Sequence, residues 1–397
     1  MHLLPKTLTA LALLTAGVTV LSAQPIDRSH LNLSIQGRYS HVINGQNIYQ
    51  RLLSTYNYGV YGATLGVSTH PQDGDWYAYA WNYPSYGIGF SFANMASLQC
   101  KNNSRFGDVL NLFGWAEFDL LRTRSFRFGP VLELGLAYTG EIYDYYRNPD
   151  NWYFGAHVCV LVDAGLRAEW LFTPQWSLLA GIHLTHHSNG MLGSPNIGVN
   201  ELAGSVSIRH YFAPTRFDAK PTAAPMKPEY GKGLHWSVFA TAGVHNCPVE
   251  FDAILVSDDP SRIAVSRFCG TAGVELDWHY SRIFATGIGL EANYAANDYR
   301  GTDLLLEGRE DPRGYSPWRV GAYLSQEVRY RNLSVHIQFG AYLFKRCGLT
   351  EDILTDFQKL GIRYHFRRTG GLFAGLDMRA HQFNRSYSLE WSLGFTL

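Results

Sequence analysis

Residues 388–397 read Ser-Leu-Glu-Trp-Ser-Leu-Gly-Phe-Thr-Leu, with a large apolar side chain at every second position. Alternate side chains of a β-strand point to opposite faces, so this stretch has one apolar face and one face of small or polar residues. The same alternation recurs over residues 86–93 and 131–138. The polar faces are rich in Gly and Ser, whereas a soluble sheet usually presents many charged residues to water. The pattern therefore predicts strands that face lipid on one side and the packed interior of a small barrel on the other.

The first residues have the composition of a secretory signal peptide. Lys6 supplies an early positive charge, an apolar run covers residues 8–21, and the run ends at Ser22-Ala23-Gln24, where the small residues allow cleavage. We therefore expect residues 1–23 to be a signal peptide. No later stretch reaches the roughly 18 to 20 apolar residues that a membrane-spanning helix needs.

Composition narrows the class of protein. Lys and Arg total 33 and Asp and Glu total 33 in 397 residues, so the formal net charge is zero. This removes the basic surface expected of a nucleic-acid binder. The 25 Tyr and the aromatic content of 14% fit the aromatic girdles of an outer-membrane barrel. The chain is predicted to be an all-β, transmembrane antiparallel β-barrel of a Gram-negative outer membrane, with a large soluble β protein as the competing interpretation.

Strand-like runs form two groups of about eight, one before residue 212 and one after residue 233. The first group falls near residues 31–43, 54–70, 85–96, 108–121, 125–139, 152–173, 176–188 and 200–212. The connection at 213–232 holds four Pro and is predicted to be a linker. Because eight strands close a small barrel, we predict two tandem eight-stranded units. One barrel of about 14 to 16 strands is the alternative.

An internal repeat supports the two-unit interpretation. Residues 165–172, Gly-Leu-Arg-Ala-Glu-Trp-Leu-Phe, resemble residues 361–366, Gly-Ile-Arg-Tyr-His-Phe, and a turn and a further strand follow each copy. We therefore expect a first barrel at residues 24–212 and a second, related unit at residues 233–397.

The end of the predicted seventh strand carries a candidate site. With a periplasmic N-terminus, this strand runs outward and ends at the cell surface. Strand alternation places His186 and Ser188 on the lipid-facing side, about 7 Å apart along the strand. Polar groups on that side are costly unless they have a partner or a function. A His and a Ser on one face can act as general base and nucleophile.

The wider segment resembles a known family. Residues 186–190, His-His-Ser-Asn-Gly, and residues 195–200, Pro-Asn-Ile-Gly-Val-Asn, are similar to the active-site strand and loop of the lipid A deacylase (acyloxyacyl hydrolase) family. Residues 84–94 and 149–151 resemble its Bacteroidetes-type members, and the similarity covers residues 80 to 212 well and the second half loosely. The resemblance implies an eight-stranded outer-membrane barrel that hydrolyses an ester-linked acyl chain of lipid A without a metal or other cofactor.

The same resemblance implies roles for individual residues. Ser188 would be the nucleophile, His186 the general base, and Asn189 and Gly190 would support the oxyanion. The family's third catalytic residue is a Glu twelve positions after the Ser, where this chain has Asn200. An Asn carbonyl can orient an imidazole but cannot offset its charge, so slower turnover is expected.

Glu201 is the alternative third residue, because it directly follows Asn200. Strand alternation sends Glu201 inward and keeps Asn200 on the same side as His186. Asn200 is therefore the preferred interpretation.

The second half offers an internal control. His187 aligns with His381, whereas His186 and Ser188 align with Ala380 and Gln382. The second unit is therefore expected to lack the site and to have a structural or substrate-positioning role.

These observations favour a serine esterase that removes an ester-linked acyl chain from lipid A in the outer leaflet. The competing hypothesis is a non-catalytic outer-membrane barrel with a structural, adhesive or solute-passage role. Expected partners are lipid A or lipopolysaccharide as substrate and the barrel assembly machinery, whose signal the terminal Phe395 and Leu397 resemble. His183 and His187 lie about 13 Å apart along a strand, too far to share one ion, so no metal is expected.

Overall fold

The computed structural model describes most of the chain outside its N-terminus. The described residues are 30–43, 53, 55–100, 104–144, 146–190, 192–193, 195–221, 223–227, 232–248, 264–296, 316–346, 355–366, 369–382 and 385–397. The predicted signal peptide lies outside these residues. The chain divides into two compact units, one of residues 1–189 and 196–228 and one of residues 190–195 and 229–397, and each barrel is described by itself.

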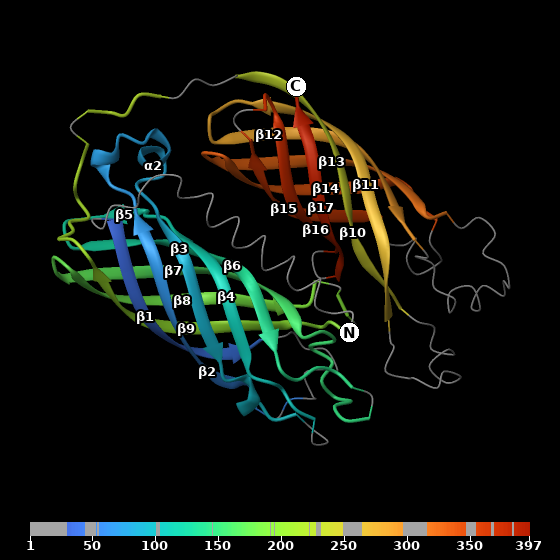
Figure 1. Cartoon of the computed structure of the whole chain (residues 1–397), viewed down its shortest axis with the longest axis horizontal. Helices are drawn as coiled ribbons and strands as arrows, with labels where there is room; N and C mark the ends of the chain where they lie inside the picture. Colours follow the sequence, from blue (N-terminus) through green and yellow to red (C-terminus); the bar gives the residue numbers. More distant parts are fainter. Residues whose placement is uncertain are drawn as a thin grey trace. The chain divides into compact units, whose positions relative to one another are not determined.

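The first unit is a closed antiparallel barrel of eight strands, drawn in blue to green in Figure 1. Its strands are β1 (Leu31–Val42), β2 (Asn57–Ser68), β3 (Ser85–Ala93), β4 (Val109–Glu117), β6 (Phe126–Thr139), β7 (Val158–Thr173), β8 (Trp176–Ser188) and β9 (Val199–Tyr211). Pairing of β1 with β9 and of β4 with β6 closes the ring, and the two-residue β5 (Leu121–Arg122) pairs with the start of β6. All eight strands predicted from alternation are present.

Short helical segments occupy two of the connections. Between β2 and β3 lie η3 (Pro71–Asp73) and α2 (Trp76–Ala80), and η4 (Met95–Ser97) follows β3. No helix among the described residues is long and apolar enough to cross a membrane.

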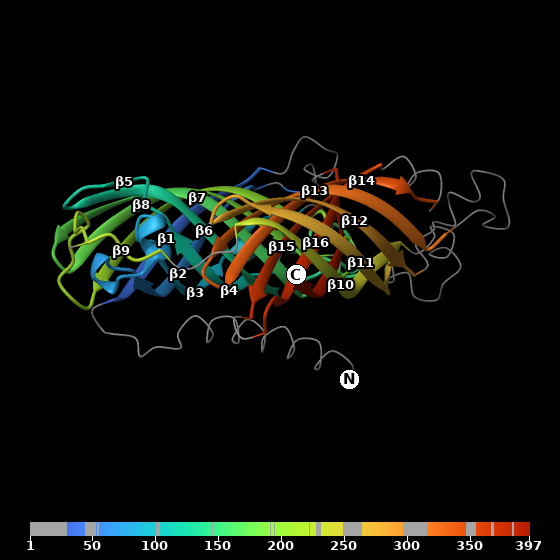
Figure 2. The same ribbon diagram turned by 90° about the horizontal axis from the view of Figure 1, so that it is seen from above.

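The second unit is another closed antiparallel barrel of eight strands, drawn in yellow to red in Figures 1 and 2. Its strands are β10 (Gly233–Pro248), β11 (Ala264–His279), β12 (Phe284–Ala295), β13 (Trp318–Tyr330), β14 (Leu333–Phe344), β15 (Asp356–His365), β16 (Leu372–His381) and β17 (Arg385–Thr396). Pairing of β10 with β17 closes this ring. The prediction of two eight-stranded units is confirmed, and the single larger barrel is wrong.

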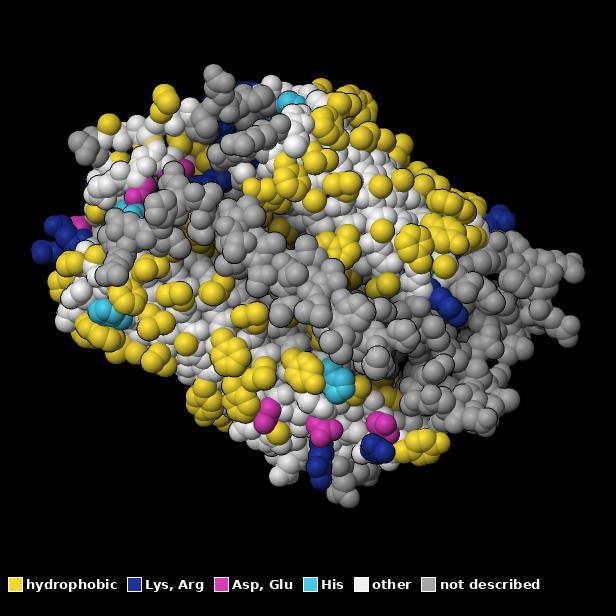
Figure 3. Space-filling model, viewed as in Figure 1, with side chains coloured by type: hydrophobic (Ala, Val, Ile, Leu, Met, Phe, Trp, Pro, Cys, Tyr) yellow, Lys and Arg dark blue, Asp and Glu magenta, His cyan; other side chains and the backbone are white. Residues whose placement is uncertain are grey.

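The outer walls are apolar and the interiors are polar. Ile182 and Leu184 of β8 are 59% and 57% exposed, while the intervening His183 is buried. Hydrophobic side chains dominate the described barrel walls in Figure 3, and charged ones are few there. This inside-out distribution is the one that a hydrocarbon environment stabilises.

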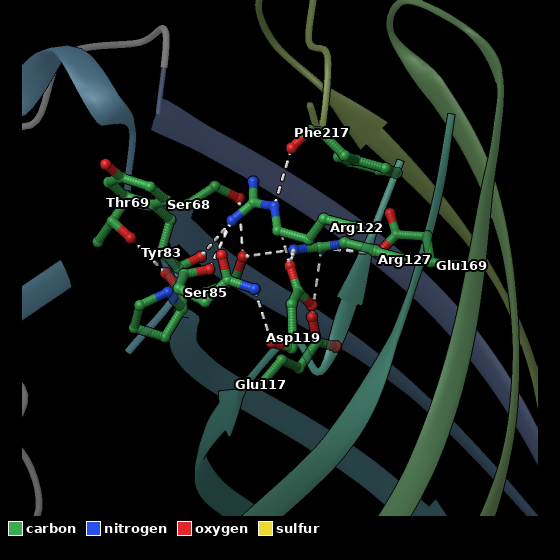
Figure 4. A network of polar contacts seen from close by, with 12 residues as sticks. Ser68, Thr69, Tyr83, Ser85, Glu117, Asp119, Arg122, Arg127, Glu169 and Phe217 are labelled. Carbon is green, nitrogen blue, oxygen red and sulfur yellow. Dashed lines mark hydrogen bonds and ion pairs between the residues drawn. The ribbon is translucent and has the colours of Figure 1, made fainter. Parts of the chain in front are cut away.

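A charged network fills the first barrel at the end where β7 turns into β8, called the turn end below (Figure 4). Glu169 accepts hydrogen bonds from Arg127 Nε (2.7 Å), Arg209 Nη1 (3.0 Å) and Tyr211 Oη (2.6 Å). Arg122 Nε donates to the carbonyl of Phe217, in the connection after β9 (2.9 Å). Removing one member of such a buried network leaves an unpaired charge, at a cost of about 3–5 kcal/mol.

The opposite end of this barrel, called the loop end, is closed by apolar side chains. They come from strand ends and from the connections between strands: Val42, Leu53, Tyr58, Val60, Ala93, Met95, Leu98, Phe106, Val109, Ala137, Tyr153, Phe154, Cys159 and Val199. This apolar plug anchors the connections that surround the end of β8 and the start of β9. The predicted site residues lie at this end.

Candidate active site at the loop end of the first barrel

The register of β8 against β9 places the predicted residues on their faces. His186 pairs with Asn200, and His187 pairs with Val199. Asn200 is exposed on the outer wall, whereas Glu201 and His187 are buried in the barrel interior. The two candidate third residues therefore lie on opposite sides of the wall, as the alternation predicts.

The outer pair is hydrogen-bonded. His186 Nδ1 lies 2.6 Å from Asn200 Oδ1. Because an amide oxygen only accepts, Nδ1 carries the proton in this pair and Nε2 keeps its lone pair. This tautomer is the one that a general base needs to take a proton from a hydroxyl.

Gly198 lies close to both His186 and Ser188. Its φ of +68° lies in the left-handed region, and a Cβ built there would lie 3.1 Å from His186 Cε1 and 3.2 Å from Ser188 Cβ. Both side chains thus contact one spot beside the Gly198 backbone. A larger residue would be strained in this conformation and would also push against both groups. The sequence analysis gave Gly198 no role of its own, although the Pro-Asn-x-Gly spacing that it singled out contains this residue.

Ser188 is only 5% exposed, although it lies on the outward face of β8. Among the described residues, no hydrogen bond engages its hydroxyl. Gly198 covers it, so the nucleophile candidate sits at the base of the loop that joins β8 to β9.

The residues that follow Ser188 form a fixed turn. Asn189 is fully buried, and its backbone N–H donates to Asn196 Oδ1 (2.9 Å). Gly190 follows with a positive φ of 56°. The Asn189 N–H is therefore already used by Asn196, a residue that the sequence interpretation missed as part of the site.

Glu201 has its own partner inside the barrel. His187 Nδ1 lies 2.9 Å from Glu201 Oε1, and His187 Nε2 lies 3.1 Å from Asn111 Oδ1. This inner pair bridges β8 and β9 directly behind the outer pair. Glu201 thus lies in the barrel interior and pairs with His187 rather than with His186.

One described cluster has the composition of a metal site. Ligand atoms of Glu133, Asp163 and His183 lie within 4.8 Å of one another. Arg38 forms ion pairs with both carboxylates, and His183 Nδ1 lies 2.9 Å from Asp163 Oδ1. The guanidinium already supplies the positive charge that a metal would bring.

Cys100 lies near the apolar plug in the connection between β3 and β4. Burial there raises the pKa of its thiol to about 12, and Asp150 adds to the shift. The thiol is therefore protonated at neutral pH and does not compete with Ser188 as a nucleophile. Cys247 and Cys347 both fall near predicted surface ends of strands, where a disulfide is possible, and their side chains lie outside the described residues.

Two family models match the chain. A model described as lipid A 3-O-deacylase (PagL) matches residues 62–209, and one described as the C-terminal domain of acyloxyacyl hydrolase matches residues 234–397. The chain belongs to the lipid A deacylase family. This confirms the resemblance drawn from residues 186–200, and it makes the protein an outer-membrane hydrolase of lipid A deacylase type.

Solved structures give weaker similarities. The outer-membrane enzyme PagL is 15% identical, with a TM-score of 0.29, over 44% of this chain and 97% of its own. Omp33 of Acinetobacter baumannii is 9% identical, with a TM-score of 0.17, over 94% of this chain and 100% of its own. Variants of a Rh. blastica porin are 8% identical, with a TM-score of 0.17, over 92% of this chain and 99% of their own. No curated protein matches the sequence.

Proposed function

We propose that this lipid A deacylase is a serine esterase that removes an ester-linked acyl chain from lipid A in the outer leaflet. Ser188 is the nucleophile, His186 the general base and Asn200 the residue that orients His186. The observation that carries the proposal is the 2.6 Å contact of His186 Nδ1 with Asn200 Oδ1, on the same outward face as Ser188. A site on that face meets its substrate without removing it from the membrane.

The reaction proceeds through an acyl-enzyme. His186 Nε2 takes the proton of the Ser188 hydroxyl as Oγ attacks the ester carbonyl carbon. The bond to the sugar oxygen then breaks, and the imidazolium returns the proton to that oxygen, releasing an alcohol. Water, activated by the same imidazole, cleaves the acyl-serine and releases the fatty acid.

The oxyanion needs donors that are not already engaged. Because the Asn189 N–H donates to Asn196, we assign the backbone N–H of Gly190 as the main-chain donor, with Asn189 supporting the turn. Asn200 orients His186 but adds no negative charge, so each step that forms an imidazolium is slower than with a carboxylate.

The equivalent hairpin of the second barrel carries other side chains. Ala380 and Gln382 align with His186 and Ser188. We assign this unit a structural or substrate-positioning role, and the C-terminal residues Phe395 and Leu397 a role in recognition by the barrel assembly machinery.

The test is mass spectrometry of lipid A from cells that express the wild type, Ser188→Ala or the control Ser97→Ala. Ser97 lies in η4, at the same end of the barrel, and is exposed. Loss of one acyl chain with the wild type and Ser97→Ala, but not with Ser188→Ala, is the expected result. Lipid A that stays unchanged with folded wild type, in cells and in detergent, would overturn the proposal.

A further inference from the structure

The loop that carries Gly198 is held by a second loop of the first barrel. The backbone N–H groups of Ile197 and Gly198 donate to the carbonyls of Trp152 and Tyr153, each at 3.2 Å. Tyr153 is buried in the apolar plug, which fixes these carbonyls in place. The position of Gly198 against His186 and Ser188 therefore depends on the connection between β6 and β7.

That connection is in turn held by two buried amides. Asn148 Nδ2 donates to the carbonyls of Ile142 (2.8 Å) and Arg105 (3.1 Å), and the Arg105 N–H donates back to Asn148 Oδ1 (2.7 Å). Asn151 Nδ2 donates to the carbonyls of Arg105 (3.1 Å) and Glu141 (3.3 Å). Both amides thus tie the β6–β7 connection to the backbone of Arg105, in the connection between β3 and β4.

Asn151 acts only as a hydrogen-bond donor in these contacts. It is fully buried, and among the described residues its Oδ1 has no hydrogen-bond partner. Only its NH₂ group forms hydrogen bonds, and these go to the main-chain carbonyls of Arg105 and Glu141. An Asp of the same shape would turn an oxygen toward both carbonyls and lose both hydrogen bonds.

We propose that Asn148 and Asn151 are positioning residues of the esterase, because they hold the carbonyls that set Gly198 against His186 and Ser188. This inference rests on the proposed roles of Ser188 and His186. Neither amide contacts a reacting atom. Their effect is on the geometry of attack, where a displacement of about 1 Å can cost on the order of 10²-fold in rate.

The matched control lies at the other end of the same barrel. Asn82 Nδ2 donates to the carbonyl of Asp119 (2.8 Å), so Asn82→Asp removes the same kind of hydrogen bond at the turn end. Asn151→Asp, Asn151→Gln and Asn82→Asp are compared with the wild type as full chains in detergent micelles. The readouts are kcat and KM with purified lipid A, the rate of Ser188 labelling by a fluorophosphonate, and heat-modifiable electrophoretic mobility as a measure of folding.

The expected result is a folded Asn151→Asp whose kcat and labelling rate fall together by about 10- to 100-fold, with KM within about twofold. Asn151→Gln, which keeps both donors on a longer arm, recovers part of the loss, and Asn82→Asp matches the wild type. An unchanged kcat in folded Asn151→Asp, or an equal loss in Asn82→Asp, would overturn the positioning role alone. An inactive wild type, or activity that survives Ser188→Ala, would overturn the proposed function and the positioning role with it.

Discussion

The two barrels end in the same hairpin but present different chemistry on its outer face. In the first barrel, β8 and β9 set His186 opposite Asn200. In the second, β16 and β17 set Ala380 opposite Ser386. The inner face is more alike, because His187 and His381 are both buried and both bind a polar partner, Glu201 and Tyr342 respectively.

This difference distinguishes residues that stabilise a barrel from residues proposed to take part in the reaction. Both interiors are filled by buried ion pairs, such as Arg127 with Glu169 in the first and Lys359 with Glu291 in the second. These pairs satisfy polar groups in a lumen and are required in either unit. His186, Ser188 and Asn200 fill no lumen, and the equivalent described positions of the second barrel hold Ala380, Gln382 and Ser386 instead.

The strongest test of the comparison is to change only the proposed nucleophile and the residue that aligns with it. Ser188→Ala is expected to lower kcat/KM on lipid A by at least about 10⁴-fold, since the acyl-enzyme can no longer form. Gln382→Ala, at the equivalent position of the second barrel, is expected to leave kcat/KM unchanged. Steady-state assays in micelles measure both, and a comparable loss in the two variants would place reacting groups in both barrels.

Stability should respond alike in both barrels. Glu169 pairs with Arg127, Arg167 and Arg209, and Glu291 pairs with Lys359 and Arg379. Glu169→Ala and Glu291→Ala each leave buried cations without this carboxylate, so each is expected to lower the free energy of unfolding by about 3–5 kcal/mol.

Urea unfolding in micelles, followed by tryptophan fluorescence, measures that change. The control is Glu141→Ala, because Glu141 is exposed at the loop end. If only one of the two barrels lost stability, the interiors would not be equivalent.

Glycines with positive φ offer a finer comparison. A Cβ at Gly198 would lie 2.7 Å from the carbonyl oxygen of His187 and close to His186, whereas a Cβ at Gly370, between β15 and β16, would meet nothing within 4 Å. The φ values are +68° and +70°, so the backbone strain of an Ala is matched. Gly198→Ala is expected to lower kcat by about 10²-fold, and Gly370→Ala to leave it unchanged. Equal effects would mean that strain, rather than contact with the site, explains the loss.

Strands and faces could be predicted from sequence because both depend on short-range alternation. The pattern around residues 176–188 and 200–212 located β8 and β9 to within a residue and assigned Asn200 outward and Glu201 inward. A polar interior and a lipid exterior impose this alternation on every strand, so each strand can be interpreted without its neighbours.

The loops could not be predicted in the same way. Asn148, Asn151 and Arg105 meet through hydrogen bonds between connections that are more than 40 residues apart in sequence. Phe217, in the segment expected to be a linker, is buried at the turn end beneath Arg127. Contacts of this kind depend on which loops the closed barrel brings together, and no local periodicity encodes them.

The smallest expected effect tests the residue that departs from the family pattern. Asn200→Glu would place a carboxylate beside His186 Nδ1, where the amide oxygen now lies at 2.6 Å. A hydrogen bond to a charged acceptor is worth about 1 kcal/mol more than one to a neutral acceptor, and here the gain arises as the imidazolium forms. We therefore expect kcat to rise on the order of fivefold to tenfold, with KM unchanged. Ser386→Glu, at the equivalent position of the second barrel, should change neither constant. A lower kcat in a folded Asn200→Glu would contradict this expectation. It would indicate that the new carboxylate is repelled by the buried Glu201 on the other side of the wall. The chain would then have Asn at this position because Glu201, paired with His187, already places a negative charge there.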